Sequence, residues 1–489
     1  MSPFIILFIG MAVVVGGIVG LRLHAFIALI LAALVVSWLA TPETIYQSQF
    51  TPAERVELAK SDDLNVLGPK LAQKHLEAQS KSKSSFISRV VTAFGGGCGK
   101  VAIIIAMAAI IGKCLLDSGA AERVVLSLRS LLGKKGTPIA FSASAFTLGI
   151  PVFFDTVFYL LMPLGKAMRM KEGKNYLLYI LTIVSGATMA HSLVPPTPGP
   201  LTVVGFFGGD VTIGEMILGG LCVGLVTVTV GYFYAVWANK RWEIPLRPSA
   251  ELSEEELEAM ANRDPKTLPP LLLSLLPILL PVILIAGHTA VDAFGTIPVW
   301  LAVVGDKNMA LMISAFVALI LLAIAKRESF RNLSSAVQSA LSSGGVIILI
   351  TAAGSAFGGV LRETGIADSV AALVPDKQSL VLIPIAFLIT TAVRTAQGSA
   401  TVAMITAGGI IAPIVGAVDL SFHPLYLALA IGCGSKPIMW ANDSGFWIIG
   451  RMSGMTPVET FKTVSVMMIL MALSGLAVVM IGALVLPMR

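Results

Sequence analysis

The sequence predicts an all-α polytopic membrane protein with two inverted-topology repeats, about ten full transmembrane helices, two re-entrant hairpins and two broken helices. Three observations support this prediction. Hydrophobic residues make up 56% of the 489 residues and charged residues only 13%, with a mean hydropathy of +0.87, whereas an ordinary soluble domain is about 25% charged. Apolar runs of membrane-spanning length recur along the chain, and the second half of the sequence resembles the first at one fixed shift.

Ten apolar runs are long enough to cross about 30 Å of hydrocarbon. They lie near 3–20, 23–40, 96–116, 175–197, 213–239, 268–288, 308–325, 343–361, 424–440 and 463–487. The first run leads directly into the second without a cleavage site of small residues, so we expect it to be retained as a span. Two more apolar regions, 137–165 and 378–415, are rich in Gly, Pro, Ser and Thr. Such regions are tolerated at membrane depth only inside protein or around a water-filled cavity, which predicts re-entrant hairpins.

These elements divide the chain into two repeats joined by a polar linker. We expect the first repeat to span 1–239 and the second to span 268–489, with a cytoplasmic linker at 240–267. The further predicted boundaries are scaffold spans at 1–40, a surface excursion at 41–93, hairpins at 137–165 and 378–415, and broken helices at 175–210 and 424–450. Basic residues gather in the linker and in the loops between spans. Because basic loops stay in the cytoplasm, we expect an outside N-terminus, five crossings to the cytoplasmic linker and five more to an outside C-terminus. An odd number of crossings in each half inverts the second half relative to the first.

Composition and motifs exclude several other classes of protein. The net charge of +6 is explained by cytoplasmic anchoring of loops, and we expect no nucleic-acid partner. The four cysteines lack CxxC spacing, which indicates neither a disulfide framework nor a zinc site. No dinucleotide-binding, Walker, HExxH or Ser/His/Asp pattern occurs in a recognisable context, so we expect no cofactor, no metal and no ATP-driven pumping.

The internal repeat is clearest where 97–124 overlays 343–370 at a shift of 246 residues. Gly119 then pairs with Gly365 near the end of both segments, where Leu, a Ser or Thr, Gly and Ala recur at the same spacing. Apolar runs align easily by chance, but this shared ending favours a true duplication.

The same shift of 246 aligns the interruptions of the two halves. It carries GIPVFFD (149–155) onto TAQGSAT (395–401), inside the second predicted hairpin. It also carries PPTPG (195–199) onto ANDSG (441–445). Corresponding Gly and Pro interruptions in two inverted halves are the best indication, in a sequence, of a transporter's central site.

Two titratable residues are candidates for proton coupling. Asp155 lies in the apolar stretch FTLGIPVFFDTVFYLLMPL, where an ionisable group usually faces a cavity, a partner or a proton path. Desolvation would favour its protonated form, so we predict that Asp155 picks up and releases the coupled proton. His191, just before the first break, could titrate near neutral pH. The alternatives are a carboxylate at the wet end of the hairpin and a histidine that only packs.

The two breaks offer polar groups for a substrate. The stretch VPPTPGP at 194–200 contains four prolines, which remove N–H donors and stop the helix. The stretch WANDSG at 440–445 supplies side-chain oxygens instead. Helix N-termini favour anions, and C-terminal carbonyls with Asp or Asn oxygens favour cations; an Asx turn with Ser444 as N-cap is the alternative reading of the second break. The residues predicted to bind substrate here are Thr197, Gly199, Asn442, Asp443 and Ser444.

The tip of the second predicted hairpin is also polar. Arg394 could fork onto a carboxylate, although a structural ion pair or a snorkelling side chain is an equal alternative. The hydroxyl and amide groups that follow suit a polyhydroxylated acid. The residues predicted to bind substrate here are Arg394, Thr395, Gln397, Ser399 and Thr401.

Taken together, four stretches resemble the gluconate permease family of proton-coupled symporters, within the wider ion-transporter group. They are GIPVFFD (149–155), VPPTPGP (194–200), RTAQGSAT (394–401) and NDSGFW (442–447). The resemblance implies a multi-pass protein of the bacterial inner membrane that takes up gluconate or a related hydroxy acid with a proton and is not an enzyme. It also implies two re-entrant hairpins, a scaffold and a moving transport domain, and we expect a homo-oligomer, with a dimer favoured.

The chain departs from the family pattern at Thr197, where gluconate permeases usually have a histidine, PPHPGP. Proton coupling and substrate contact then fall to other groups such as Asp155, or the substrate differs from gluconate. The longer segment 41–90 is a second departure. Two other functions stay open: sodium-coupled carboxylate uptake, with Asn442 and Asp443 holding the ion, and a membrane-embedded enzyme using Asp155 and His191 as acid and base.

Overall fold

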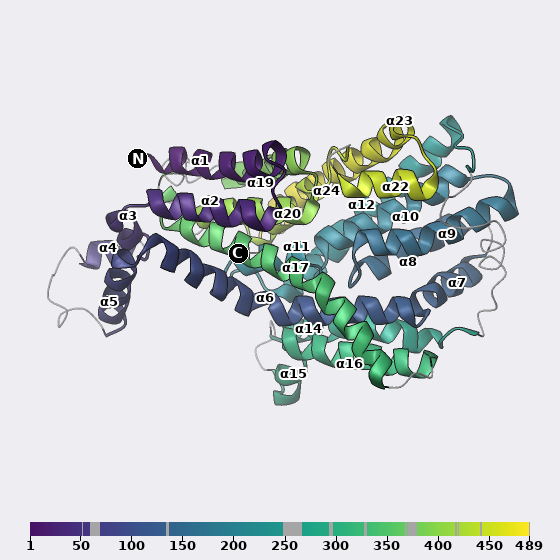
Figure 1. Ribbon diagram of the computed structural model, residues 1–489, viewed down its shortest axis with the longest axis horizontal. Helices are drawn as coiled ribbons and strands as arrows, with labels where there is room; N and C mark the ends of the chain where they lie inside the picture. The colour runs from purple at the N-terminus through teal and green to yellow at the C-terminus, as the bar shows by residue number, and fades with distance from the viewer. Residues whose placement is uncertain are drawn as a thin grey trace.

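The computed structural model describes residues 1–50, 52–58, 69–133, 136–247, 267–292, 297–326, 330–366, 369, 379–415, 418, 420–440 and 443–488. Every regular element within these residues is a helix, and the helices form an elongated bundle (Figure 1). Helices dominate because a backbone in lipid must satisfy its N–H and C=O groups internally. The predicted all-α class is therefore confirmed.

Seven helical segments are long and apolar enough to cross a membrane, by length and composition. They comprise α6 (Phe86–Asp117), α10 with α11 (Tyr176–Leu193 and Pro198–Phe206), α12 (Ile213–Arg241), α14 (Leu271–Asp292), α16 (Lys307–Lys326), α17 (Phe330–Arg362) and α24 (Val466–Val485). The three remaining predicted spans fall on shorter apolar helices, α1 (Pro3–Val15), α2 (Ala25–Leu39) and α21 (Leu425–Gly434). The chain is a multi-pass membrane protein.

Four pairs of helices are interrupted close to the predicted positions. The hairpin helices are α8 (Thr137–Gly149) with α9 (Phe154–Glu172), and α19 (Leu382–Gln397) with α20 (Ala400–Val415). The broken helices are α10 with α11, and α21 with α22 (Ser444–Ser453). The shorter elements are η1 (Gly16–Gly20), α7 (Ala120–Leu132), α15 (Val299–Val304), η4 (Ser379–Val381), α23 (Pro457–Thr460) and η5 (Phe461–Ser465).

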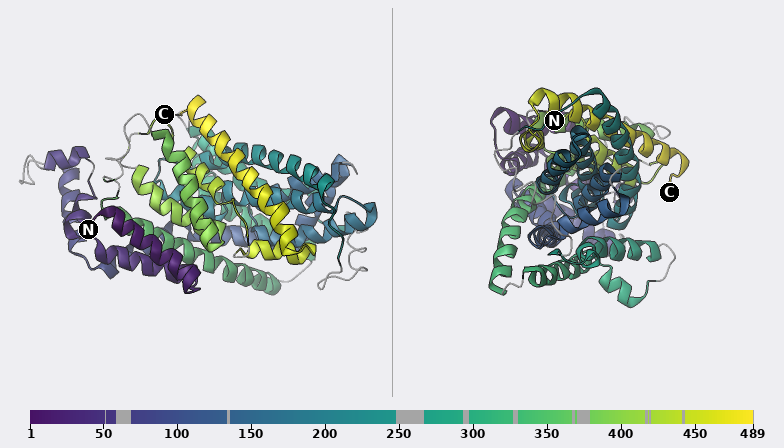
Figure 2. Two further views of the ribbon diagram at one scale, coloured as in Figure 1. Left: turned by 90° about the horizontal axis from the view of Figure 1, so that it is seen from above. Right: turned by 90° about the vertical axis from the view of Figure 1, so that its right-hand side faces the viewer.

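The two hairpins begin and end at opposite ends of the bundle. At the linker end, Arg169 of α9 pairs with Glu243 at 3.5 Å, and Arg247 donates to the carbonyl of Gly454 at 2.6 Å. At the terminal end, Ser379 and Ser421, which flank the second hairpin, are joined by a 2.7 Å hydrogen bond between their hydroxyls. The N–H of the nearby His423 donates to the carbonyl of Pro487 at 2.8 Å. Figures 1 and 2 show α9 and α22 toward one end and the N-terminus toward the other.

Helix boundaries follow the 246-residue shift from α6 onward. The shift carries the start of α9 onto Ala400, the first residue of α20, and the start of α11 onto Ser444, the first residue of α22. Two glycine pairs with positive φ obey the same shift: Gly119 and Gly365 (76° and 75°), and Gly208 and Gly454 (68° and 74°). These coincidences support the proposed duplication, because left-handed backbone positions favour glycine wherever they occur.

Small residues let the helices approach closely, as expected where lipid provides no hydrophobic drive for association. A Cβ added to Gly97 of α6 would lie 2.4 Å from the Cβ of Ser355 in α17. A Cβ added to Gly186 of α10 would lie 2.2 Å from the carbonyl oxygen of Ser142 in α8. These glycines fix the spacing between the hairpin, the broken helix and the neighbouring spans.

The predicted surface excursion forms three helices, α3 (Pro42–Gln47), α4 (Pro52–Leu58) and α5 (Pro69–Lys83), at one end of the molecule (Figures 1 and 2). Its C-terminal boundary differs from the predicted 41–93, because α6 already begins at Phe86. The Ser85 hydroxyl caps this helix by accepting from the N–H of Ser88 at 3.1 Å. Glu363 anchors the junction by pairing with Lys81 at 3.0 Å and with Arg89 at 3.1 Å.

Candidate functional site

Both hairpin tips and both helix breaks meet at one cavity of about 380 Å³, which we call the central cavity. This volume falls within the roughly 300–1,000 Å³ typical of ligand pockets. The tips contribute their N-terminal turns of α9 and α20, and the breaks contribute residues from α10, α11 and the segment between α21 and α22. The residues lining the central cavity are Phe153, Phe154, Asp155, Thr156, Thr188, His191, Pro198, Ile347, Ile350, Arg394, Gly398, Ser399, Ala400, Thr401, Val402, Lys436, Met439, Asp443 and Gly445.

Arg394 and Asp443 form a buried ion pair at the wall of this cavity. They are 3% and 4% exposed, and Nη2 of Arg394 hydrogen-bonds to Oδ2 of Asp443. Nε of Arg394 donates to the carbonyl of Ser435 at 3.0 Å. Asp443 uses its other oxygen to cap α22, accepting from the N–H of Gly445 at 2.7 Å. The alternative reading of Ser444 as the N-cap is therefore corrected: Asp443 caps the helix, because its carboxylate reaches the first free N–H groups.

Lys436 places a second buried cation at the cavity. It is 3% exposed and lies just after α21, where the chain turns toward the second break. Its ammonium interacts electrostatically with Arg394 and Asp443, yet no described residue forms a hydrogen bond or a close ion pair with it. Burying an ammonium group without a direct partner lowers the stability of the fold. An anion bound beside Lys436 would offset this loss.

Asp155 and His191 line the same cavity. Asp155 lies in the first turn of α9, where the helix dipole favours a negative charge. Asp443 is the nearest negative group that acts on it. His191 of α10 lies with its Nε2 3.5 Å from the hydroxyl of Thr401, and its ring packs edge-on against Phe153 at 5.9 Å between centroids. Its Nδ1 is buried and makes no hydrogen bond with the described residues.

The tip of the second hairpin turns at Gly398, which ends α19 with a φ of +81°. This left-handed conformation favours glycine and lets the chain reverse within two residues. The hydroxyl of Ser399 then accepts from the N–H of Val402 at 3.3 Å and so caps α20. The hydroxyl of Thr401 approaches Nε2 of His191 to 3.5 Å. The tip therefore presents hydroxyls and a helix N-terminus together.

The structure brings six of the predicted site residues to the central cavity: Asp155, His191, Arg394, Ser399, Thr401 and Asp443. Three others lie outside its lining. Thr197 is 2% exposed and its hydroxyl donates to the carbonyl of Val194 at 2.7 Å. Gly199 packs against α20, where an added Cβ would lie 2.7 Å from the sulfur of Met404. The carbonyl of Thr395 accepts a hydrogen bond from the indole N–H of Trp440 at 2.9 Å. Asn442 and the side chains of Gln397 and Ser444 lie outside the described residues.

Sequence reasoning missed several residues that line the cavity. Lys436 could have been found by the argument applied to Asp155, since it is a lone ionisable residue in the apolar stretch LALAIGCGSKPIMW. Ile347 and Ile350 of α17 carry no such signal, because an apolar residue in a span faces lipid as readily as a cavity. Only the packing of α17 against the hairpins reveals them.

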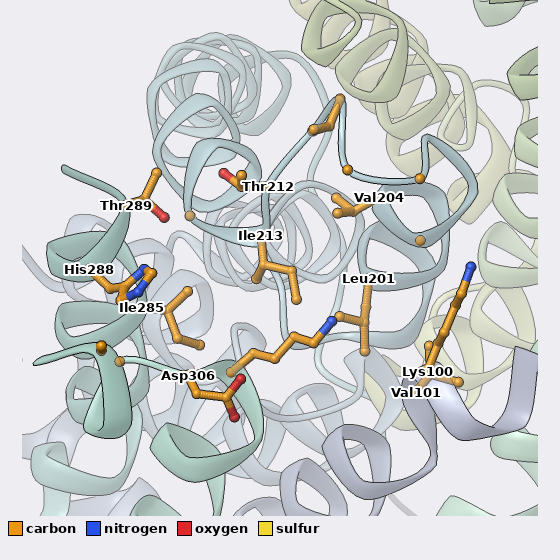
Figure 3. Close-up of a pocket in the computed structure, with 18 residues that line it drawn as sticks. Lys100, Val101, Leu201, Val204, Thr212, Ile213, Ile285, His288, Thr289 and Asp306 are labelled. Carbon is orange, nitrogen blue, oxygen red and sulfur yellow. The ribbon is translucent and has the colours of Figure 1, made fainter. Parts of the chain in front are cut away.

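A larger cavity of about 490 Å³ lies elsewhere and is lined by residues of α6, α11, α12, α14, α15 and α16 and of the segments between them. Figure 3 shows Lys100 on one wall and His288 with Asp306 on the opposite wall. None of the predicted site residues lines it. We take the smaller central cavity as the candidate site, because the buried charges and both hairpin tips converge there.

The central cavity gathers charged and polar groups of several kinds. It combines two buried cations, two carboxylates, hydroxyls and helix N-termini. Among the described residues, no group of three or more His, Cys, Asp and Glu side chains is arranged to hold a metal ion.

The chain is similar to known permeases. Residues 80–485 match the model of the GntP family of permeases. The chain is 33% identical over 398 residues to a gluconate permease of Pseudomonas aeruginosa, which covers 80% of this chain and 86% of that protein. It is 35% identical over 396 residues to an uncharacterized permease of Haemophilus influenzae, over 77% of this chain and 79% of that protein.

A solved structure shares the fold. The YdaH transporter of Alcanivorax borkumensis superposes with a TM-score of 0.60 at 14% identity, covering 82% of this chain and 89% of that one. That likeness shows a membrane-transporter fold alone. The family match extends from the end of the surface excursion to the end of α24 and includes both hairpins and both breaks. On these grounds, the chain belongs to the GntP family of permeases.

Proposed function

We propose that this protein takes up gluconate or a related sugar acid by proton symport, through elevator-type alternating access. The observation that carries the proposal is the convergence of both hairpin tips and both helix breaks on one cavity that contains buried charges of both signs. A site shared by two halves of a transporter can be exposed first to one side of the membrane and then to the other. The gluconate permeases among its relatives support the choice of substrate class.

A sugar acid suits the central cavity chemically. Its carboxylate would meet a buried cation, and its hydroxyls would meet Ser399, Thr401 and Thr188. Hydroxyl groups both donate and accept hydrogen bonds, so a polyol chain can form hydrogen bonds with the hydroxyls that line the cavity. Helix N-termini at the two hairpin tips add favourable fields for the negative end of the substrate.

Asp155 is the proposed carrier of the coupled proton. It faces the cavity from the first turn of α9. Among the described residues, no basic side chain lies within ion-pair distance of its carboxylate. A carboxylate placed in this way can bind a proton on one side of the membrane and release it on the other. His191 lies beside the same cavity and is the second proposed proton-coupling residue.

The proposed movement carries the hairpins and broken helices against a scaffold of α1, α2, α6, α14, α16 and α17. The opposite orientation of the two hairpins supports it, because each could open the site to a different side. The larger cavity is lined by α11 of the moving part and by α6, α14 and α16 of the scaffold, so the two parts are incompletely packed there. We further propose assembly as a dimer.

Uptake into proteoliposomes tests the function. Vesicles containing the purified protein should accumulate labelled gluconate when the outside is made acidic, and a proton ionophore should abolish accumulation. Sodium-driven uptake in the absence of a pH gradient would replace protons with sodium as the coupling ion. Failure to transport or bind any sugar acid, with or without a gradient, would overturn the proposal. Recovery of chemically altered substrate would indicate an enzyme instead.

Asp155→Asn tests the proton assignment separately. The variant should lose accumulation driven by a pH gradient, because the amide cannot carry the proton. It should keep exchange of labelled for unlabelled gluconate, because exchange needs only binding and movement of the site. The assignment is wrong if gradient-driven accumulation survives in Asp155→Asn.

A further inference from the structure

We infer that the ammonium group of Lys436 binds the carboxylate of the transported anion, while Arg394 has a structural role in the wall of the site. This inference rests on the proposed function, because it assumes that the central cavity binds a sugar acid. It names the residue that distinguishes a carboxylate from a neutral polyol. Three contacts, the lack of a partner for Lys436 and the charge balance of the cavity support it.

Arg394 is the obvious candidate for the carboxylate, but its charge is already compensated. Its guanidinium pairs with Asp443 and donates to the carbonyl of Ser435 at 3.0 Å. Asp443 is held in turn by the N–H of Gly445 at 2.7 Å. Only Nη1 of Arg394 lacks a partner among the described residues, and it is buried. A ligand could therefore gain one hydrogen bond from Arg394 but could not gain its full charge without breaking the pair.

Lys436 carries the uncompensated charge. Its side chain lines the cavity, is 3% exposed, and has no direct anionic or hydrogen-bonding partner among the described residues. The free energy lost by burying an unpaired ammonium is recovered when an anion binds beside it, because opposite charges attract strongly where water is scarce. A neutral ligand of the same shape recovers none of it.

The charges around the cavity link binding of the anion to the proton. Arg394 and Lys436 are cationic, and Asp155 and Asp443 are acidic. With Asp155 ionised, these four groups sum to zero and an added carboxylate creates a net negative site. With Asp155 protonated, the sum is positive and the carboxylate restores neutrality. Each ligand therefore strengthens binding of the other, as reciprocal linkage requires.

Two other titratable groups act on Lys436: the imidazole of His191 in α10 and the thiol of Cys433 in α21. A proton taken up by His191 would add a positive charge and so favour the anion in the same direction as protonation of Asp155. Affinity for the anion should therefore fall as pH rises and these groups lose their protons.

Calorimetric titration of the purified protein with gluconate and with its neutral analogue gluconamide tests the inference. Wild-type protein should bind gluconate more tightly than gluconamide. Lys436→Met should weaken gluconate binding about 10- to 100-fold, the range expected for a hydrogen bond to a charged group, and leave gluconamide binding within about threefold. Lys436→Arg should keep most of the preference, because the cation is retained.

Lys100→Met is the matched control, since Lys100 lines the larger cavity instead (Figure 3). It should bind both ligands as the wild type does. Thermal unfolding checks that Lys436→Met is folded, and Lys436→Gln serves the same purpose if it is not. Wild-type affinity for gluconate should decrease with rising pH, and Asp155→Asn should weaken that dependence.

Two failures are distinguishable. If wild-type protein binds gluconate but Lys436→Met binds it within about threefold as well, the role of Lys436 is overturned and the proposed function stands. If folded wild-type protein binds neither gluconate nor another sugar acid, both are overturned.

Discussion

The two halves of the chain, 86–241 and 332–485, share helix boundaries but divide the chemistry between them. At positions related by the 246-residue shift, Asp155 of the first half corresponds to Thr401, whereas Leu148, Ala190 and Thr197 correspond to Arg394, Lys436 and Asp443. The first half therefore supplies a carboxylate at its hairpin tip. The second half supplies both cations and the buried ion pair.

The helix breaks differ in the same way. The first is enforced by prolines, with Thr197 bonded back to the carbonyl of Val194 at 2.7 Å. The second is enforced by Asp443, which caps α22 and pairs with Arg394. Duplication thus provides a similar backbone arrangement twice, and divergence places the proposed anion-binding groups in one copy and the proposed proton carrier in the other.

The largest expected effect comes from breaking the ion pair that the first half lacks. Arg394→Leu introduces the first-half residue and leaves Asp443 buried without its cation, which should lower the free energy of unfolding by about 3–5 kcal/mol. Thermal unfolding in detergent would measure this loss. Arg394→Leu combined with Asp443→Thr converts both positions to their first-half counterparts and should recover much of the stability. Equal loss in the single and double variants would contradict this account.

An intermediate effect is expected at Gly186 and its counterpart Gly432. A Cβ at Gly186 would lie 2.2 Å from the carbonyl oxygen of Ser142, and one at Gly432 would lie 2.7 Å from that of Ser192. Backbone atoms cannot move aside as a flexible side chain does. Gly186→Ala should therefore lower the free energy of unfolding by about 3 kcal/mol, and Gly432→Ala should lower it by about 1 kcal/mol. Apparent melting temperatures should rank in that order. The reverse order would show that the first hairpin is packed more loosely than its contacts indicate.

The smallest effect is expected at another related pair, Gly99 of α6 and Gly345 of α17. Nothing lies within 4 Å of a Cβ added to either residue. Because alanine favours a helix over glycine, Gly99→Ala and Gly345→Ala should each raise stability by at most about 1 kcal/mol. Both melting temperatures should match or exceed that of the wild type. A marked decrease in one alone would reveal a contact, such as a partner subunit, present in only one half.

Local features of the sequence predicted most of the fold. All ten apolar runs lie on helices, and both hairpins and both breaks lie within a few residues of their predicted positions. These features are encoded by neighbouring residues, through hydropathy and the helix-stopping effect of Pro and Gly. The start of α6 was misplaced because its first turns are polar enough to resemble the excursion, although Ser85 is a recognisable N-cap.

The sequence by itself determined the class of protein, the spans, the repeat and the polar residues available at each interruption. Each of these features depends on residues that are close together in the sequence. Only the tertiary structure decided which of those residues share a cavity. Arg394 and Asp443 are separated by 49 positions, and His191 and Thr401 by 210. Packing of α19 against α21 within the second half brought the first pair together, and packing of the first half against the second brought His191 to Thr401. The same packing left Thr197 out of the lining and placed Lys436 in it. Such contacts depend on how whole helices pack, which no local pattern of residues specifies.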